Sequence, residues 1–262
     1  MEELVLREQR GGVLRLTLNR PDQMNSLNTE LVAGLADAVT DARRDVSVRV
    51  VHITGAGRAF CAGADLVEAR TVTATADRFR RWVAAWHRAF ATFEDCPKPI
   101  VALVNGLALA GGLELALACD YIVARRSARI GDVHANFGLV PGGGGSQRLP
   151  DAVGSRVARW LMYTGEILTA DRAAEVGLVQ EVLADDEFDE SAWAAGEKMA
   201  GRSQPGLAFM KRMSRPALDV RGLELELEAA AGLVVGEDAR EGLAAFAEKR
   251  SPKFAAVVDD PL

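Results

Sequence analysis

Hydrophobic residues recur with two different spacings along the first part of the chain. Between Leu14 and Leu18 leucines alternate with polar residues, which is the period of a strand buried on one face. After Asn28, a residue type that favours helix N-caps, hydrophobic residues fall on one helical face up to Ala42. The run at 48–53 then predicts another strand. Strands that alternate with helices favour an α/β fold with a parallel sheet.

Two passages of the chain repeat the same order of a strand, a loop of small residues and a helix. The first contains the loop at 58–66, and the second runs from a strand at 100–104 into a helical segment that reaches Asp120. In the second passage, Gly111 and Gly112 have no side chain that would keep a ligand away from the backbone. The repetition predicts a stacked α/β architecture.

The glycine pair of the second passage stands where a helix is predicted to begin. If the helix starts at Gly111, its first N–H groups have no partner inside the helix and point outward. The aligned peptide dipoles favour negative charge at this end, and Glu114 follows within the first turn. Free amides beside a carboxylate could form an oxyanion site with an adjacent acid/base. The same residues also fit a plain helix start with a favourable first-turn glutamate.

Two further helical regions complete the pattern. Between residues 76 and 93 aromatic side chains recur on one helical face, which is typical of a core or a pocket wall. From about residue 200 onward the chain is almost wholly helical. We therefore expect a core region at 1–199 and a helical C-terminal subdomain at 200–262.

Composition and charge narrow the classes of function. Thirty-one Lys and Arg against 37 Asp and Glu give a formal net charge of −6, whereas a nucleic-acid-binding protein would be basic. Charged or polar residues interrupt every apolar run well short of a membrane span, and no secretory signal is visible in the first residues. Cys61, Cys96 and Cys119 have no metal-ligand spacing, so we expect a reduced, cytoplasmic protein without a metal site.

Five segments carry motifs that are specific in combination: 18–21, 53–66, 98–120, 141–149 and 246–254. Together they resemble the crotonase, or enoyl-CoA hydratase/isomerase, family over nearly the whole chain. The resemblance implies a crotonase-like spiral of β-β-α units whose C-terminal subdomain serves oligomerisation, as a homotrimer or as a hexamer (a dimer of trimers). It also implies an acyl-CoA substrate, with no metal, flavin or nicotinamide cofactor.

An oxyanion hole follows from the resemblance as well. Carried over by motif, the backbone N–H groups of Ala62 and Gly111 would hold the thioester oxygen. Reactions at the α or β carbon of an acyl thioester pass through an enolate, whose charge lies on this oxygen. Losing one preorganised donor of this kind costs ~3 kcal/mol in comparable enzymes.

The family pattern points to two groups of residues for the coenzyme. Ala64, Asp65 and Leu66 match the loop that lines the adenine pocket and positions the pantetheine arm. Lys249 and Lys253 match basic contacts to the phosphates, although a solvated helix end would explain both lysines equally well.

The catalytic pair departs from the family pattern at one position. Family hydratases use two glutamates, of which Glu114 matches the first. The second would fall twenty residues later, where this chain has Val133-His134 instead of Pro-Glu. Histidine titrates near neutrality and can serve as acid or base, and Asp132 could orient it. The alternative is a loop histidine bonded to the backbone.

We interpret the chain as an enoyl-CoA hydratase-like lyase that adds water to a 2-enoyl-CoA through an enolate. Glu114 would be the main acid/base and His134 its partner. Because His134 replaces a glutamate, two alternatives stay open. One is another family reaction on acyl-CoA, by an isomerase, a hydrolase or a decarboxylase. The other is a non-catalytic acyl-CoA-binding protein.

Overall fold

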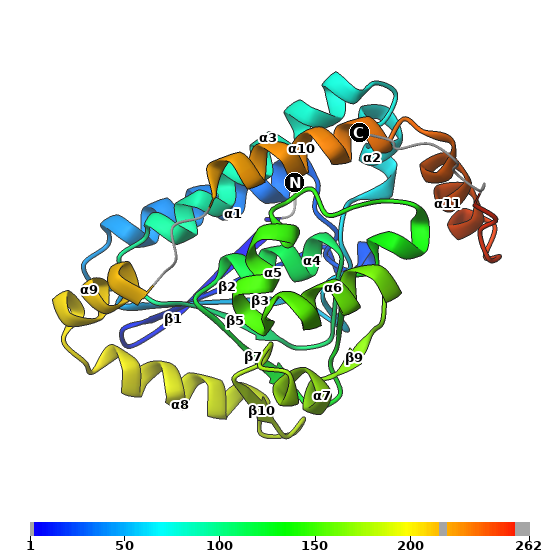
Figure 1. Cartoon of the computed structure of the whole chain (residues 1–262). Helices are drawn as coiled ribbons and strands as arrows, with labels where there is room; N and C mark the ends of the chain where they lie inside the picture. Colours follow the sequence, from blue (N-terminus) through cyan, green and yellow to red (C-terminus); the bar gives the residue numbers. More distant parts are fainter. Residues whose placement is uncertain (1–2, 215–218, 255–262) are drawn as a thin grey trace.

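A six-stranded sheet forms the centre of the computed structural model, which describes residues 3–214 and 219–254 (Figure 1). Its strands, in spatial order, are β1 (Val5–Arg10), β2 (Val13–Leu18), β3 (Val50–Gly55), β5 (Ile100–Val104), β7 (Tyr121–Arg125) and β10 (Glu181–Leu183). The first two strands form an antiparallel hairpin, and every other neighbouring pair is parallel. The predicted parallel sheet is therefore confirmed.

A second sheet of four strands lies beside the first. It consists of β4 (Ala59–Cys61), β6 (Leu107–Leu109), β8 (Arg129–Gly131) and β9 (Leu168–Thr169). The first three strands run parallel, and β9 is antiparallel to β8. Three times the chain passes from a strand of the large sheet (β3, β5, β7) to one of the small sheet (β4, β6, β8) and then into a helical segment. This is the spiral of β-β-α units that the resemblance implies.

Helices cover the two sheets (Figure 1). They are α1 (Thr29–Arg44), α2 (Leu66–Val72), α3 (Ala76–Asp95), α4 (Gly111–Ala118), α5 (Gly145–Val153), α6 (Ser155–Thr164), α7 (Ala170–Glu175), α8 (Phe188–Ala200), α9 (Gln204–Ser214), α10 (Val220–Leu233) and α11 (Glu237–Ala247), with the 3₁₀ helices η1 (Pro21–Gln23) and η2 (His134–Phe137). The predicted cap of α1 is confirmed, because the Asn28 side chain accepts a hydrogen bond from the N–H of Leu31. No helix among the described residues combines the length and hydrophobicity needed to cross a membrane.

The predicted aromatic stripe lies on α3 and is buried. Trp82, Trp86 and Phe90 are at most 7% exposed, and the ring centroids of the two tryptophans are 4.7 Å apart. The C-terminal helix α10 lies along α3 (Figure 1). The aromatic face of α3 is therefore enclosed by the fold, and Trp86 reaches the loop that begins α4.

The C-terminal region of the described chain is helical, as predicted. Helix α8 ends at Ala200, and α9, α10 and α11 follow it. Helix α10 packs on α3 and α5, and α11 packs against η2. These contacts place the last helices beside the segments that carry the chemistry described next.

Candidate active site

A strained turn precedes the first residue of α4. After β6 ends, Ala110 has φ +48° and ψ −119°, a conformation that non-glycine residues rarely adopt and that costs about 1–3 kcal/mol. The N–H of Ala110 donates to the carbonyl of Gly131, and its carbonyl accepts from the N–H of Glu114, each at 3.1 Å. The turn leads directly into α4, so the N–H of Gly111 occupies the first helical position.

The two glycines of this turn allow the backbone segments to approach closely. A Cβ on Gly112 would lie 2.0 Å from the carbonyl oxygen of Cys61, and one on Gly111 would lie 2.8 Å from Cζ3 of Trp86. Helix α4 therefore packs directly against the end of β4. The structure thus brings together the two small-residue loops that the sequence singles out.

The prediction that Ala62 supplies an oxyanion donor is wrong. Its N–H donates a 3.0 Å hydrogen bond to the carbonyl of Met24, so this amide is already occupied within the fold. A donor that is bonded to the protein cannot also stabilise a charge that develops on a substrate without breaking that bond.

The amide of Ala64, two residues further on, differs from that of Ala62. The residues before and after Ala64 both bond to Leu27. The N–H of Leu27 donates to the carbonyl of Gly63, and the carbonyl of Leu27 accepts from the N–H of Asp65. In such a parallel bridge the N–H of the middle residue points away from the partner strand. Within the described residues, neither the Ala64 N–H nor the Gly111 N–H donates a hydrogen bond. The nitrogen of Ala64 is 3.6 Å from where a Cβ on Gly111 would stand.

Glu114 follows Gly111 within the first turn of α4 and is buried, with 2% of its surface exposed. Its Oε1 accepts hydrogen bonds from the N–H groups of Gly143, at 2.7 Å, and Gly145, at 3.0 Å. Burial raises the pKa of Glu114 above its ordinary value, and the positive charge of His134 and the two amides oppose this shift. The other oxygen, Oε2, lies 4.0 Å from Nε2 of His134. The structure therefore pairs the two residues that the sequence predicts as the acid/base pair.

Asp132 and His134 form a hydrogen-bonded pair. Nδ1 of His134 is 2.8 Å from Oδ1 of Asp132, and the backbone N–H of His134 donates to the same oxygen at 3.2 Å. Burial alone would lower the pKa of His134, but the Asp132 and Glu114 carboxylates outweigh it and raise this pKa to about 9. The bond to Asp132 directs Nε2 toward Glu114, so the arrangement can hold and transfer one proton.

The loop predicted to line the adenine pocket is anchored by Asp65. Its carboxylate caps α2 by accepting from the N–H groups of Val67 and Glu68, and it forms a 2.6 Å ion pair with Arg20. Leu66 follows as the first residue of α2 and is 42% exposed. The carboxylate of Asp65 thus holds the backbone of Ala64 in place, while Leu66 faces solvent.

The two lysines predicted to contact the coenzyme lie beyond the end of α11. Both Lys249 and Lys253 are exposed, and the backbone N–H of Lys253 donates to the Glu241 carboxylate. That carboxylate also pairs with Arg250. The structure brings neither lysine into contact with Glu114 or His134, and their role with the coenzyme stays a prediction.

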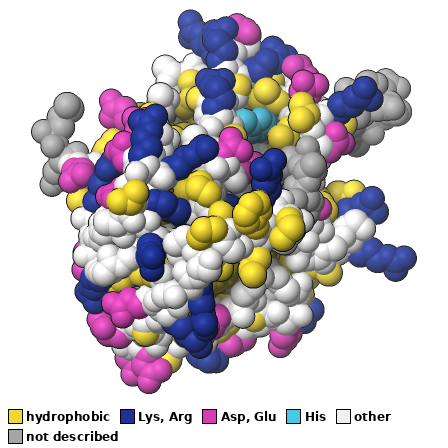
Figure 2. All heavy atoms as spheres, turned by 90° about the vertical axis from the view of Figure 1, so that its left-hand side faces the viewer, with side chains coloured by type: hydrophobic (Ala, Val, Ile, Leu, Met, Phe, Trp, Pro, Cys, Tyr) yellow, Lys and Arg dark blue, Asp and Glu magenta, His cyan; other side chains and the backbone are white. Residues whose placement is uncertain are grey.

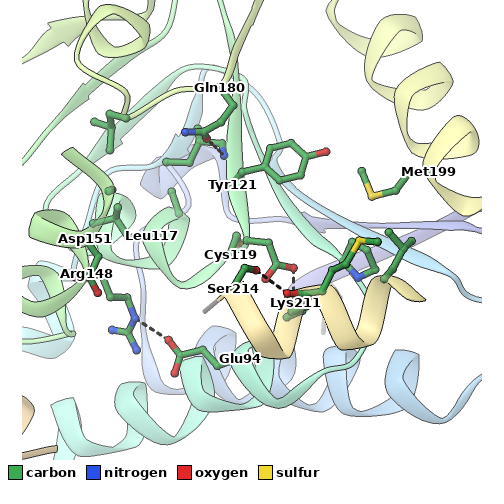
Figure 3. A pocket seen from close by; sticks show the side chains of 18 residues that line it. Glu94, Leu117, Cys119, Tyr121, Arg148, Asp151, Gln180, Met199, Lys211 and Ser214 are labelled. Atoms are coloured by element: carbon green, nitrogen blue, oxygen red, sulfur yellow. Dashed lines mark hydrogen bonds and ion pairs between the residues drawn. The ribbon is translucent and has the colours of Figure 1, made fainter. Parts of the chain in front are cut away.

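A separate cavity of about 660 Å³ lies at the C-terminal end of α4 (Figure 3). Four of its charged side chains form two ion pairs, Glu94 with Arg148 and Asp120 with Lys211, each at 2.9 Å. It contains none of the predicted catalytic residues. Arg148 connects it with the loop that binds Glu114, because its Nη1 donates to the carbonyl of Gly143.

Comparison with known proteins shows the family of the chain. The family model for enoyl-CoA hydratase/isomerase matches residues 8–256. A 2,3-dehydroadipyl-CoA hydratase from Escherichia coli is 40% identical over 260 residues, which cover 97% of this chain and 99% of that protein. A crotonyl-CoA hydratase from Syntrophomonas wolfei is 33% identical over 256 residues, with coverage of 96% and 98%.

Solved structures share the fold over nearly the same length. An enoyl-CoA hydratase from Mycobacterium avium subsp. paratuberculosis is 31% identical with a TM-score of 0.85, covering 97% of this chain and 99% of that chain. A carnitinyl-CoA hydratase from Mycobacterium avium is 35% identical, with the same TM-score and coverage. The chain therefore belongs to the enoyl-CoA hydratase/isomerase, or crotonase, family.

Proposed function

We propose that this protein is an enoyl-CoA hydratase, which adds water to the conjugated double bond of a 2-enoyl-CoA. One observation carries the proposal: the unbonded amides of Ala64 and Gly111 meet at the start of α4, within one helical turn of Glu114, whose carboxylate lies 4.0 Å from His134. The hydratases among its relatives support the same reaction class. No cofactor enters the proposed reaction.

The two amides would stabilise the charge that develops on the substrate. When the thioester oxygen accepts from the N–H groups of Ala64 and Gly111, electron density is drawn from the double bond and Cβ becomes electrophilic. The donors are fixed by the fold before the substrate arrives, so little reorganisation accompanies the reaction. Each such donor contributes about 3 kcal/mol to the transition state.

Glu114 and His134 would move the protons. The oxygen of a water molecule bonds to Cβ while Glu114 accepts one of its protons, and the electron pair of the double bond shifts to form the enolate. His134 then donates the proton on Nε2 to Cα, and the thioester carbonyl re-forms. Transfer of the proton from Glu114 to His134, 4.0 Å away, restores both groups.

The direct test of the proposed function is an absorbance assay. Hydration removes the conjugated enoyl thioester, so its absorbance falls when enzyme is added to crotonyl-CoA, longer 2-enoyl-CoAs and 2,3-dehydroadipyl-CoA. We expect turnover of at least one member of the panel. Binding of these thioesters without any turnover would instead favour a non-catalytic acyl-CoA-binding protein.

The proposed proton donor predicts the alkaline limb of the pH profile. His134 must be protonated to donate, so kcat/KM should fall as the pH rises through about 9, the pKa of His134. Asp132→Asn removes a charge that raises this pKa, so the limb should move to lower pH. Asp37→Asn, at an exposed position of α1, is the matched control. An unchanged limb in Asp132→Asn would exclude Asp132 from this role.

For coenzyme binding we propose the backbone around Ala64, Asp65 and Leu66, together with Lys249 and Lys253. The exposed Leu66 beside the Ala64 amide offers an apolar contact next to the thioester site. The two lysines, at the end of the helix that packs on η2, provide positive charge for phosphates.

We propose a homotrimer, alone or paired into a hexamer, that assembles through the C-terminal helices. Helix α9 exposes three large hydrophobic side chains, more than a solvated helix needs: Phe209, Met210 and Met213, at 61–75% exposure. Hydrophobic side chains gather among charged ones on the face that carries α9 (Figure 2). For the compartment we propose the cytoplasm, which the three free, buried cysteines support.

A further inference from the structure

The glycine-rich loop at 143–146, which runs into the first residues of α5, is held by two buried carboxylates. Four consecutive backbone N–H groups, those of residues 143–146, all donate to glutamate side chains. Glu114 accepts from the amides of 143 and 145. Glu226, on α10, accepts from those of 144, at 2.5 Å, and 146, at 2.8 Å. The donors alternate strictly between the two carboxylates, so the loop joins one glutamate to the other.

The loop leaves no room for a side chain between the two carboxylates. A Cβ on Gly143 or on Gly145 would stand 2.9 Å from an oxygen of Glu114. Gly144 has φ +99°, and a Cβ there would lie 1.7 Å from Nη1 of Arg148. The hydrogen bonds to the two glutamates are therefore made by backbone without side chains at the three glycines. Rotation of one peptide group there also changes the direction of the next N–H.

Glu226, like Glu114, is buried and accepts hydrogen bonds from backbone amides. Its side chain is 6% exposed, although it comes from a helix about eighty residues beyond the loop in the chain. Both the N–H and the hydroxyl of Ser146 donate to its Oε2. Removing one partner of such a buried, hydrogen-bonded group leaves donors unsatisfied and favours a rearrangement of the backbone.

We propose that Glu226 is a positioning residue for Glu114 and that it acts through the glycine-rich loop. By taking the amides of residues 144 and 146, Glu226 turns those of 143 and 145 toward α4. These two then fix Oε1 of Glu114 and leave Oε2 facing His134. The inference rests on the proposed hydration, in which Glu114 accepts the proton from water.

Glu226→Gln tests the inference by kinetics. Its one carbonyl oxygen cannot replace both carboxylate oxygens, and its amide group would present N–H toward N–H donors. We expect kcat to fall by about 10²-fold, as for a catalytic group misplaced by a fraction of an ångström or more, with KM changed less than about threefold. Glu224→Gln, exposed on the same helix, is the matched control and should keep wild-type kcat.

Backbone amide exchange measured by NMR tests the same inference without relying on turnover. Gly143 and Gly145 make no bond to Glu226, yet their N–H groups should exchange faster in Glu226→Gln, while those of the buried strand β5 keep their protection. Unchanged kcat in an active enzyme, or unchanged protection of the two glycine amides, would overturn the inference. If wild type turns over no enoyl-CoA, the proposed function fails, and the exchange experiment still decides whether Glu226 positions Glu114.

Discussion

Glu114→Gln is expected to lower kcat for enoyl-CoA hydration by about 10²–10⁴-fold, the range contributed by a general acid/base. The amide oxygen can still accept from the N–H groups of Gly143 and Gly145, so the loop should keep its conformation. What is lost is the ability to take a proton from water. Steady-state kinetics with an enoyl-CoA that the wild type hydrates will give the change in kcat.

The control for this variant separates catalysis from binding and folding. Glu30→Gln replaces an exposed first-turn glutamate of α1 and should leave kcat unchanged. The dissociation constant of butyryl-CoA, which has no double bond to hydrate, should stay within a few-fold in Glu114→Gln. Wild-type kcat in Glu114→Gln would exclude Glu114 from the proposed mechanism.

His134→Ala should have the second largest effect, a fall in kcat of about 10²-fold or more, because it removes the group that protonates Cα in the proposed mechanism. The substitution also leaves the buried Asp132 carboxylate without its charged partner, which costs about 1–3 kcal/mol of stability. Kinetics and thermal unfolding should therefore be measured on the same preparations.

A double variant distinguishes chemistry from folding at His134. Asp132→Asn combined with His134→Ala removes the uncompensated charge, so part of the lost stability should return while kcat stays low. If kcat instead recovers together with the melting temperature, His134 is a structural loop residue. That outcome would match the alternative reading of the sequence, in which this histidine has no catalytic task.

The sequence predicts the scaffold of the site because local patterns determine it. Alternating leucines mark β2, the β-branched runs mark β3 and β5, and the glycine pair marks the start of α4. The small residues in the loop at 58–66 and at the glycine pair permit close backbone contacts. Both loops could therefore be recognised as parts of the site. The pairing of Glu114 with His134 was also within reach, since His134 stands twenty residues after Glu114, at the spacing of the second family glutamate.

The choice of oxyanion amide could not be predicted from the loop's own residues. Which N–H is free depends on a partner elsewhere: Leu27 takes the groups on either side of Ala64, and Met24 occupies the Ala62 amide. Both partners lie more than thirty residues earlier in the chain. Gly63, with φ +108°, is the local sign of a turn between the two alanines, but a glycine in a small-residue loop does not show which amide it frees.

Glu226 was missed for a related reason. It lies in the C-terminal region, for which the sequence predicts only helices, and its bonds reach backbone amides about eighty residues earlier in the chain. The glycine-rich segment enters the sequence analysis only as part of the family motif at 141–149, whereas the structure shows four of its amides bound by buried carboxylates. A short-range pattern contains no information on such a long-range contact.

The most direct test of the account is the structure of the protein in complex with butyryl-CoA. We predict that the thioester oxygen lies about 2.7–3.1 Å from the backbone nitrogens of both Ala64 and Gly111, with Cβ facing Glu114. A thioester oxygen that contacts neither nitrogen, or a thioester bound away from Glu114, would contradict the account.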